Sequence, residues 1–419
     1  MIKYFLSLIL LFYILNGYAQ KVLTFQVNSG DYDRINTPVS IGIPQFSEAE
    51  MADLVLYELS DNGKKEVPFQ VEKDYNTVLW FNLQGTTPKN SLRTFQVSVR
   101  EEPAKAVEKI LIEKDASTLK IRSDDRYILQ YNLAEVMPPD GVDPIFKRSG
   151  FIHPVWSPDQ QVLTRIQPPD HYHHYGIWNP WTRTKFQGRQ VDFWNLGEAQ
   201  GTVRFKSMLS LTEGPVFGGF RVLQEHVDLT AQQGEVVALN EVWDIRAWNI
   251  SSEDKVWLVD FTSILNCATD SGILFFKYRY GGGIGYRATE RWGKDNSSVL
   301  TSEGKTRDEA DATRTRWCII QGETNGKEGN SGILFMSSPQ NREHPEPIRM
   351  WPSNDHKGKA NMFFMFTPIR DNKWELNPGK NYVLRYRMLI FDGELKAGEA
   401  ERYWTDFAFP PKIVLTDNK

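Results

Sequence analysis

Three of the chain's seven histidines lie within Pro168–Trp181, a segment that reads PPDHYHHYGIWNPW. His171, His173 and His174 come shortly after Asp170. Histidine exchanges protons close to neutral pH, and its neutral ring is a common metal ligand. The segment therefore predicts an acid–base site or a metal site, with an unusually aromatic piece of core as the third interpretation.

A metal site is the less favoured of these because the segment supplies few ligands. On a β-strand, His171 and His173 would share one face and His174 would point to the other. Two imidazoles and Asp170 then remain, whereas a structural zinc site needs four ligands. No HExxH pattern supplies the others. We predict no cofactor and keep a divalent metal as the alternative.

Acid–base chemistry on a substrate needs a carboxylate beside the histidines in a polar cleft. Glu225 and Glu241 lie in apolar, strand-like runs, where an ionised group is costly unless it is paired or lines a cleft. The predicted catalytic residues are Asp170, His171, His173, Glu225 and Glu241. The alternative is structural ion pairing with an arginine, for which the candidates are Arg165, Arg183 and Arg204.

Three further stretches carry candidate substrate-binding residues. Trp178 and Trp194 are predicted to form a stacking platform for a sugar ring. The run KYRYGGGIGYR, residues 277–287, has no helix pattern after it, so it is not a nucleotide fingerprint. Its glycines would let the backbone pass close to a ligand or form a bulge; the alternative is a solvated edge. The loop NREHPEPIRMWP, residues 341–352, lines a pocket or caps the sheet. The predicted substrate-binding residues are His174, Trp178, Asp192, Trp194, Arg279, Arg287, Asn341 and His344.

The elements that must position these residues are almost all β-strands. Residues 20–113 alternate apolar and polar positions in short runs, which predicts a small N-terminal β-sandwich. Residues 114–419 contain longer alternating runs, such as Val236–Ile245, and predict a large antiparallel β-sandwich. The polar stretch 100–109 is the expected linker, Ser47–Met51 could form one helical turn, and Ala397–Phe407 has helical spacing. The predicted fold class is all-β.

The ends and the composition of the chain indicate its compartment. Residues 1–19 have a positive start, an apolar run and small residues before Gln20, as expected for a secretory signal peptide. A lipid anchor is not indicated, because no cysteine lies near this point. No later apolar run is long enough for a membrane helix. A net charge of −4 without a long basic run argues against nucleic-acid binding. We expect an exported, periplasmic or secreted protein, and leave open whether Cys267 and Cys318 pair.

With these motifs in hand, the chain resembles a bacterial family labelled PmoA-like, or methane oxygenase-like, from about residue 149 to residue 410. Tyr175 stands where that family often has arginine. The resemblance rests on the order of five motifs, which are GFIHPV at 150–155, PDHxHHxG at 169–176, DFW at 192–194, the glycine stretch 281–287, and Asn341 with His344-Pro345.

The methane oxygenase label is not taken literally. An integral methane monooxygenase subunit needs several membrane helices and a copper centre, and this sequence predicts neither. The resemblance implies instead an exported β-rich protein, similar to those encoded in bacterial carbohydrate-utilisation gene sets. It also implies a large sandwich similar to the galactose mutarotase-like supersandwich.

Two classes of function follow. The first is a carbohydrate-active enzyme that acts on a glycoside or modified sugar by histidine and carboxylate chemistry, as a hydrolase, lyase or epimerase. A hydrolase of the usual kind would need two carboxyl groups about 5–10 Å apart. The second is a non-catalytic periplasmic protein that binds or organises a glycan, with the histidines as hydrogen-bonded fillers.

Overall fold

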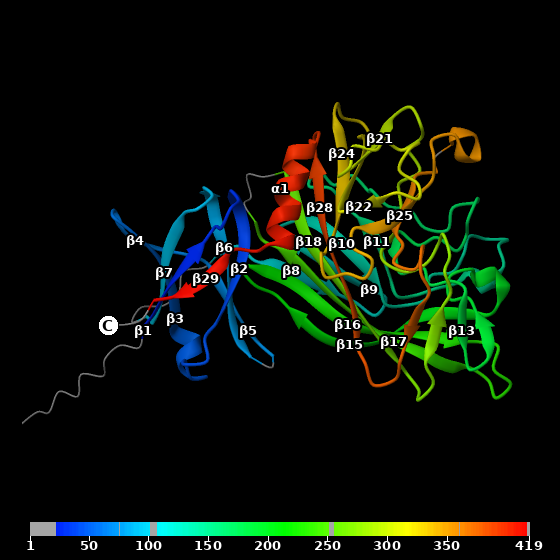
Figure 1. Cartoon of the computed structure of the whole chain (residues 1–419), viewed down its shortest axis with the longest axis horizontal. Coiled ribbons are helices and arrows are strands. Elements are labelled where there is room, and N and C mark those ends of the chain that lie inside the picture. The colour runs from blue at the N-terminus through cyan, green and yellow to red at the C-terminus, as the bar shows by residue number, and fades with distance from the viewer. Residues whose placement is uncertain (1–21, 75, 101–106, 251–254, 360, 417–419) are drawn as a thin grey trace, which may run out of the picture.

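The computed structural model describes residues 22–416 apart from 75, 101–106, 251–254 and 360. Antiparallel β-strands dominate this part of the chain, so the predicted all-β class is confirmed (Figure 1). The predicted helix is present as α1 (Ala397–Ala408). The predicted signal peptide and most of the predicted linker lie outside the described residues. The short 3-10 turns are η1 (Glu50–Asp53), η2 (Pro144–Phe146), η3 (Leu196–Glu198) and η4 (Asp355–Gly358).

A small β-sandwich is built from two sheets that share one core. Phe25 and Phe95 of one sheet contact Phe81 of the other, with ring centroids 6.0 and 4.9 Å apart respectively. One sheet has the order β29 (Lys412–Leu415), β1 (Val22–Asn28), β7 (Leu92–Val99), β3 (Leu54–Ser60) and β4 (Gly63–Glu66). The other has the order β2 (Arg34–Gly42), β6 (Thr77–Thr87) and β5 (Phe69–Lys73).

The C-terminal strand β29 belongs to this small sandwich. The sequence had predicted instead that all residues from 114 to 419 form the large sandwich. β29 pairs antiparallel with β1, with Phe25 opposite Leu415. Figure 1 shows this red strand beside the blue N-terminal strands. β8 (Ile110–Lys114) pairs with β9 of the large sandwich, so the sheet of the large sandwich already includes residue 110. Strand pairing between the two chain ends has no local sequence signal.

The large sandwich packs a nine-stranded sheet on an eight-stranded sheet around a single hydrophobic core. The eight-stranded sheet has the order β15 (Gly201–Thr212), β16 (Phe217–Asp228), β17 (Val236–Trp248), β18 (Val256–Cys267), β28 (Tyr382–Asp392), β24 (Asn330–Ser337), β23 (Trp317–Glu323) and β21 (Ser297–Thr301). The nine-stranded sheet has the order β22 (Arg314–Thr315), β25 (Glu346–Met350), β26 (Phe363–Phe366), β20 (Gly285–Arg287), β12 (Ile177–Trp178), β11 (Phe151–Val155), β10 (Arg126–Asn132), β9 (Thr118–Ser123) and β8. A four-stranded sheet adds β14 (Arg189–Val191), β13 (Thr184–Phe186), β19 (Ile273–Phe275) and β27 (Trp374–Leu376).

The nine-stranded sheet buries different residues on its two faces, because successive side chains of a strand point to opposite sides. In β26, Phe364 and Phe366 belong to the main core, whereas Phe363 and Met365 belong to a second aromatic cluster. In β12, Ile177 faces the main core and Trp178 faces that second cluster. The outer face of this sheet therefore carries a separate aromatic layer.

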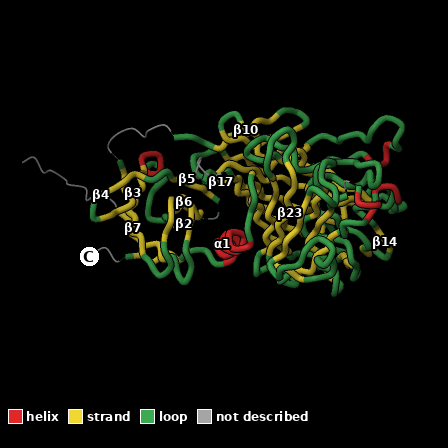
Figure 2. The backbone as a smooth tube through the Cα atoms, turned by 90° about the horizontal axis from the view of Figure 1, so that it is seen from above, coloured by secondary structure: helices red, strands yellow, loops and turns green. Residues whose placement is uncertain are grey.

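Helix α1 connects the two sandwiches (Figure 2). Its Asp406 accepts hydrogen bonds from Arg34 Nη1 at 2.8 Å and Thr37 Oγ1 at 2.9 Å, both on the small sandwich. Its Trp404 Nε1 donates to the carbonyl of Ser337, on the large one, at 3.0 Å. No helix among the described residues is long and apolar enough to cross a membrane. Cys267 and Cys318 are both free thiols.

Candidate functional site

The histidine segment forms consecutive turns rather than the expected strand. The His171 amide donates to the carbonyl of Pro168 at 2.8 Å, and the His174 amide donates to the carbonyl of His171 at 3.1 Å. The turns bring all three rings together: the His171 and His174 rings stack 4.7 Å apart, and His173 lies 4.9 Å from His174. The prediction that His174 points away from the other two was wrong, because alternation applies only to extended backbone.

The three rings lie on the aromatic layer of the nine-stranded sheet. His174 is fully buried, and its ring lies 5.0 Å from Phe363 of β26 and 5.2 Å from Trp178 of β12. Trp194 and Trp351, which come from two loops, lie 5.6 Å from the same imidazole. Segments far apart in the sequence thus form one floor beneath the histidines.

Asp170 is held in place by arginines that approach from other elements. Arg287 of β20 is fully buried, and its Nη2 donates to Asp170 Oδ2 at 2.6 Å. Arg165 Nη2 lies 3.7 Å from Asp170 Oδ1. Burial opposes ionisation of Asp170, but hydrogen bonds from His171 and Arg287 outweigh it and hold the pKa of the carboxyl well below its ordinary value. Burial lowers the pKa of Arg287 to about 10, so the ion pair is intact at neutral pH.

The same carboxylate orients His171. Asp170 Oδ2 lies 3.1 Å from His171 Nδ1, and an ionised carboxylate can only accept, so Nδ1 carries the proton. In the neutral form of the ring, the lone pair is then on Nε2. The His171 side chain keeps 24% of its surface exposed, so a substrate can reach it. This is the arrangement of a general base with an orienting carboxylate.

The other two histidines are neutral at physiological pH. Burial lowers the pKa of His173 to about 3 and lowers the pKa of His174 well below its ordinary value; neighbouring basic groups add to both effects, and Asp170 partly opposes the shift at His173. Arg287 Nη1 lies 3.5 Å from His174 Nδ1, which makes Nδ1 the acceptor and leaves the proton on Nε2. Neither ring can act as a proton donor in its imidazolium form near pH 7. Both shape the site as neutral side chains.

The site keeps polar groups without a protein partner. Among the described residues, His174 Nε2, Trp178 Nε1 and Trp194 Nε1 are buried N–H groups with no acceptor in the chain. Each such group costs about 1–3 kcal/mol. Groups of this kind, gathered in one place, are uncommon in a purely structural core.

One group in the described part of the chain has the composition of a metal site. It comprises Asp170, His171 and His356 of η4, whose ligand atoms lie within 4.8 Å of one another. His356 lies outside the histidine segment and was not predicted from the sequence as a ligand. However, Asp170 already pairs with two guanidinium groups, whose positive charges oppose a cation at this carboxylate. The geometry favours an acid–base site over a metal site.

The glycine run 281–283 serves packing rather than ligand approach or a solvated edge. All three residues are buried and have positive φ. A Cβ on Gly282 would overlap the ring of Trp181, and one on Gly283 would overlap the carbonyl oxygen of Phe366. The run therefore lets the chain turn tightly against the core before β20, which then presents Arg287 to the site.

Glu225 does not join the histidines. It lies on β16, where Arg204 Nη2 and Lys206 Nζ of β15 approach it at 2.9 and 3.0 Å. Burial opposes its ionisation, but hydrogen bonds from Lys206 and Arg204 outweigh it and lower the pKa. The alternative interpretation, ion pairing with Arg204, is what the structure contains.

Glu241 also lies elsewhere, in the main core. It is fully buried on β17, and His226 Nε2 lies 2.7 Å from its Oε2. Its Oε1 accepts hydrogen bonds from Asn179 at 2.7 Å and from Trp243 at 2.8 Å. A buried carboxylate is tolerated when its oxygens are satisfied in this way. No carboxylate predicted on a strand faces His171 or His173.

The remaining predicted residues divide between the site and the scaffold. Asp192 accepts the amide hydrogens of Trp194 and Asn195 at 2.8 and 2.9 Å, so it fixes the loop that carries Trp194. Arg279 is exposed, with its guanidinium 5.1 Å from the ring of Tyr280.

Two predicted residues belong to other parts of the fold. Asn341 donates to Glu346 at 2.8 Å and to the Arg385 carbonyl at 2.8 Å, within the large sandwich. His344 stacks on Trp404 of α1, with ring centroids 6.1 Å apart. The loop 341–352 therefore contributes to the site near its end, through Arg349 and Trp351.

Trp178 and Trp194 are not an exposed stacking platform, since they are 0% and 4% exposed. Half-buried Tyr280 is more accessible, and its ring lies 5.3 Å from Trp194. Its hydroxyl accepts from Trp351 Nε1 at 3.2 Å and from Arg349 Nη2 at 3.1 Å. In the sequence, Tyr280 stands directly before the glycine run, but the substrate-binding role in this stretch was predicted for Arg279 and Arg287 instead.

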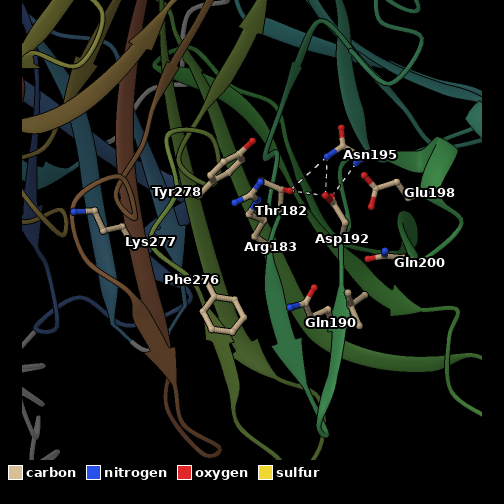
Figure 3. A pocket seen from close by; sticks show the side chains of 11 residues that line it. Thr182, Arg183, Gln190, Asp192, Asn195, Glu198, Gln200, Phe276, Lys277 and Tyr278 are labelled. Carbon is tan, nitrogen blue, oxygen red and sulfur yellow. Dashed lines mark hydrogen bonds between the residues drawn. The ribbon is translucent and has the colours of Figure 1, made fainter.

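A polar cavity of about 440 Å³ lies beside this site, at one end of the four-stranded sheet (Figure 3). Its wall includes the Asp192 turn, with Thr182 and Asn195 bonded to the carboxylate as the dashed lines show. Tyr278 also lines the cavity, and its ring lies 5.7 Å from Tyr280. Of the predicted site residues, only Asp192 lines it.

The fold and the geometry define an all-β protein of two sandwiches, with a histidine–aspartate site on the outer face of a sheet of the larger one. A model of DUF6807, described as a family of unknown function, matches residues 118–405. The chain belongs to this family, and the whole histidine–aspartate site lies inside the matched range. The PmoA-like label is not confirmed by this match. A search of curated proteins gave no match.

One solved structure is described as a protein in the glycosyl hydrolase family 38 from Enterococcus faecalis. It is 9% identical, and the superposition has a TM-score of 0.45. The match covers 95% of this chain and 48% of that chain, so this chain spans about half of that structure. A likeness at this level carries no argument about function.

Proposed function

We propose that this protein is an exported carbohydrate-active enzyme of the lyase or epimerase kind, which uses His171 as a general base. The observation that carries the proposal is the Asp170–His171 pair: Asp170 Oδ2 lies 3.1 Å from Nδ1, while Arg287 fixes the carboxylate from a buried position. A pair held in this way points the lone pair of Nε2 away from the carboxylate. General-base catalysis by such a group is worth about 10²–10⁴ in rate.

The step is proton abstraction from a carbon next to a carbonyl or carboxylate of the sugar. The C–H bond breaks, a new N–H bond forms at His171 Nε2, and the electron pair stays on the substrate as an enolate. In a lyase the enolate then expels an alkoxide from the neighbouring carbon, and the alkoxide takes up the proton from His171 Nε2 or from water. In an epimerase water delivers a proton to the other face of the carbon, and His171 passes its proton to solvent.

Arg165 is suited to the charge that this step creates. Its side chain is 17% exposed, and its guanidinium lies beside the Asp170 carboxylate. A guanidinium group binds a carboxylate or an enolate in a planar, bidentate manner. The proposed substrate is therefore an oxidised glycoside, such as a uronide or a keto-glycoside.

Hydrolysis by two carboxylates is less well supported. Such a hydrolase needs a general acid and a second carboxylate about 5–10 Å apart. Among the described residues, Glu225 and Glu241 face other partners, and Asp170 is bound to arginines. Single-base chemistry is what the described residues support.

The test is a product screen of the purified protein with neutral, keto- and uronic glycosides, followed by chromatography and mass spectrometry. The expected result is an unsaturated or epimerised sugar that is absent with His171→Gln. Release of ordinary reducing sugars by water would contradict the proposal in favour of hydrolysis. Saturable binding without any product, unchanged in His171→Gln, would favour the glycan-binding alternative.

A further inference from the structure

Two sets of contacts connect the polar cavity of Figure 3 with the histidine site. The Asp192 carboxylate lines the cavity, and it also accepts the amide hydrogen of Trp194, whose ring lies 5.5 Å from His173. On the other side, Tyr278 of the cavity contacts Tyr280, and Tyr280 contacts Trp194. The cavity and the histidine site are therefore linked through the Asp192–Trp194 turn and through the Tyr278–Tyr280 pair.

The side chains of the cavity can bind hydroxyl groups. Gln190, Asn195 and Gln200 contribute amides, each of which both donates and accepts hydrogen bonds. Figure 3 shows the Asn195 side chain beside the Asp192 carboxylate, whereas the Gln190 amide lies apart from it, further along the lining of the cavity. Polar groups of both kinds, few in number and set around a cavity, fix the orientation of a small ligand.

The cavity also offers a ring surface that is already fixed. The guanidinium of Arg183 lies 3.7 Å from the centroid of the Tyr278 ring, which is a close cation–π contact. Tyr278 is half-buried, so part of the ring remains accessible. An aromatic face of this kind packs well against the C–H face of a pyranose.

The charges of the cavity balance. Arg183 and Lys277 contribute two positive charges, and Asp192 and Glu198 contribute two negative ones. Asp192 is moreover satisfied by the hydrogen bonds of its own turn. A net charge of zero favours an uncharged ligand over an anionic one. The volume of about 440 Å³ is in the range of small-molecule sites.

We propose that this cavity binds a neutral sugar unit of the substrate, next to the oxidised unit that reacts at His171. The substrate is then at least a disaccharide, with the two units bound on either side of the Trp194 loop. The link to His171 rests on the proposed function, whereas sugar binding in the cavity stands on its own lining residues.

The test measures binding rather than turnover. Isothermal titration and ligand-observed NMR are run with methyl glucoside, galactoside and xyloside, with cellobiose, maltose and lactose, and with an aldobiouronic acid. The variants are Gln190→Ala and Tyr278→Ala in the cavity. Lys185→Ala, an exposed residue of β13 outside the cavity, is the matched control. Gln190 is exposed, so its variant tests the cavity without disturbing the core.

The expected result is that at least one disaccharide binds the wild-type protein, and that each cavity variant weakens it by roughly tenfold or more. Lys185→Ala keeps the wild-type affinity. The proposal is overturned if no disaccharide of the set binds, or if both cavity variants bind as the wild type does. Disaccharide binding that depends on the cavity without any turnover would retain this proposal and reject the proposed function. Turnover that depends on His171 but not on Gln190 or Tyr278 would retain the proposed function and reject sugar binding in the cavity.

Discussion

Arg287 Nη2 lies 2.6 Å from Asp170 Oδ2, although 117 residues separate the two in the chain. β20 places Tyr286 in the main core and Arg287 on the opposite face of the nine-stranded sheet. The turn that carries Asp170 meets the guanidinium there, and the same carboxylate bonds to His171. One buried arginine thus sets the position of the proposed acid–base pair.

Removal of this arginine is expected to reduce stability. Arg287→Met would leave Asp170 without its strongest partner, at a cost of about 2 kcal/mol, below the usual figure for a buried pair because Asp170 is partly exposed. The measurement is chemical unfolding, compared with Lys147→Met. Lys147 pairs with Glu135 on the surface at 2.9 Å, so its loss should cost at most about 1 kcal/mol.

A double variant separates the ion pair from simple packing. If the ion pair matters, Arg287→Met combined with Asp170→Asn should cost less than the sum of the two single changes, since no unpaired charge remains. Strict additivity would mean that Arg287 contributes by packing alone.

Asp170→Asn is expected to impair the chemical step more than binding. An amide at this position no longer favours the Nδ1–H tautomer of His171, so kcat for the product-forming reaction should fall about 10²-fold or more while KM changes little. Asp140→Asn, an exposed carboxylate away from the site, is the control and should behave as wild type. A loss of substrate affinity without a loss of kcat would assign Asp170 to binding instead.

Glu346 should make stability depend on pH. Burial raises its pKa from the ordinary 4.5 to about 7, despite hydrogen bonds from Ser337, Asn341 and Tyr386. The folded protein therefore holds a proton that the unfolded chain loses between these values. Stability falls as pH rises from about 4.5 to about 7, by on the order of 3 kcal/mol.

Glu346→Gln removes this titration while its amide still bonds to the same neighbours. The difference in unfolding free energy between variant and wild type, measured from pH 5 to pH 8, should grow in favour of the variant as pH rises. Other groups titrate equally in both proteins and cancel in the difference. A constant difference across this range would show that Glu346 titrates at its ordinary pKa.

Gly282→Ala should be strongly destabilising for two reasons. The new methyl group would overlap the Trp181 ring, and the φ of +79° is one that alanine rarely adopts. Gly188 is the matched control: its φ is +84°, and nothing lies within 4 Å of an added Cβ. Gly188→Ala should cost about 1–2 kcal/mol from the backbone alone, and Gly282→Ala about 1–3 kcal/mol more. Equal melting temperatures for the two variants would contradict the packing role of Gly282.

The sequence was informative where local pattern determines structure. Alternation in runs such as Val236–Ile245 is a direct consequence of one buried face, and the helix from Ala397 has its own periodicity. Asp170, His171, His173, His174 and Arg287 were predicted as site residues and do meet. They were found because four of them are sequence neighbours and the fifth ends a distinctive glycine run.

The rest depends on contacts between distant segments. Glu225 and Glu241 look alike in sequence, as carboxylates in apolar strands, and only their neighbours show that one pairs with Arg204 and the other with His226. His356 has no motif, and its ring approaches His171 to 5.3 Å only through the fold. The cavity beside the site is formed by segments near residues 183, 191 and 277; two of these adjoin motifs that the sequence singled out, but only the fold brings them together around one cavity.

The most direct test of the central claim is solvent isotope exchange. The purified protein is incubated in D2O with keto- and uronic disaccharides, and the sugars are followed by proton NMR and mass spectrometry. The account predicts deuterium at a carbon next to the carbonyl or carboxylate, or an elimination product, with wild type and Lys185→Ala but not with His171→Gln. Exchange that persists in His171→Gln, or none with any oxidised sugar that binds, would contradict it.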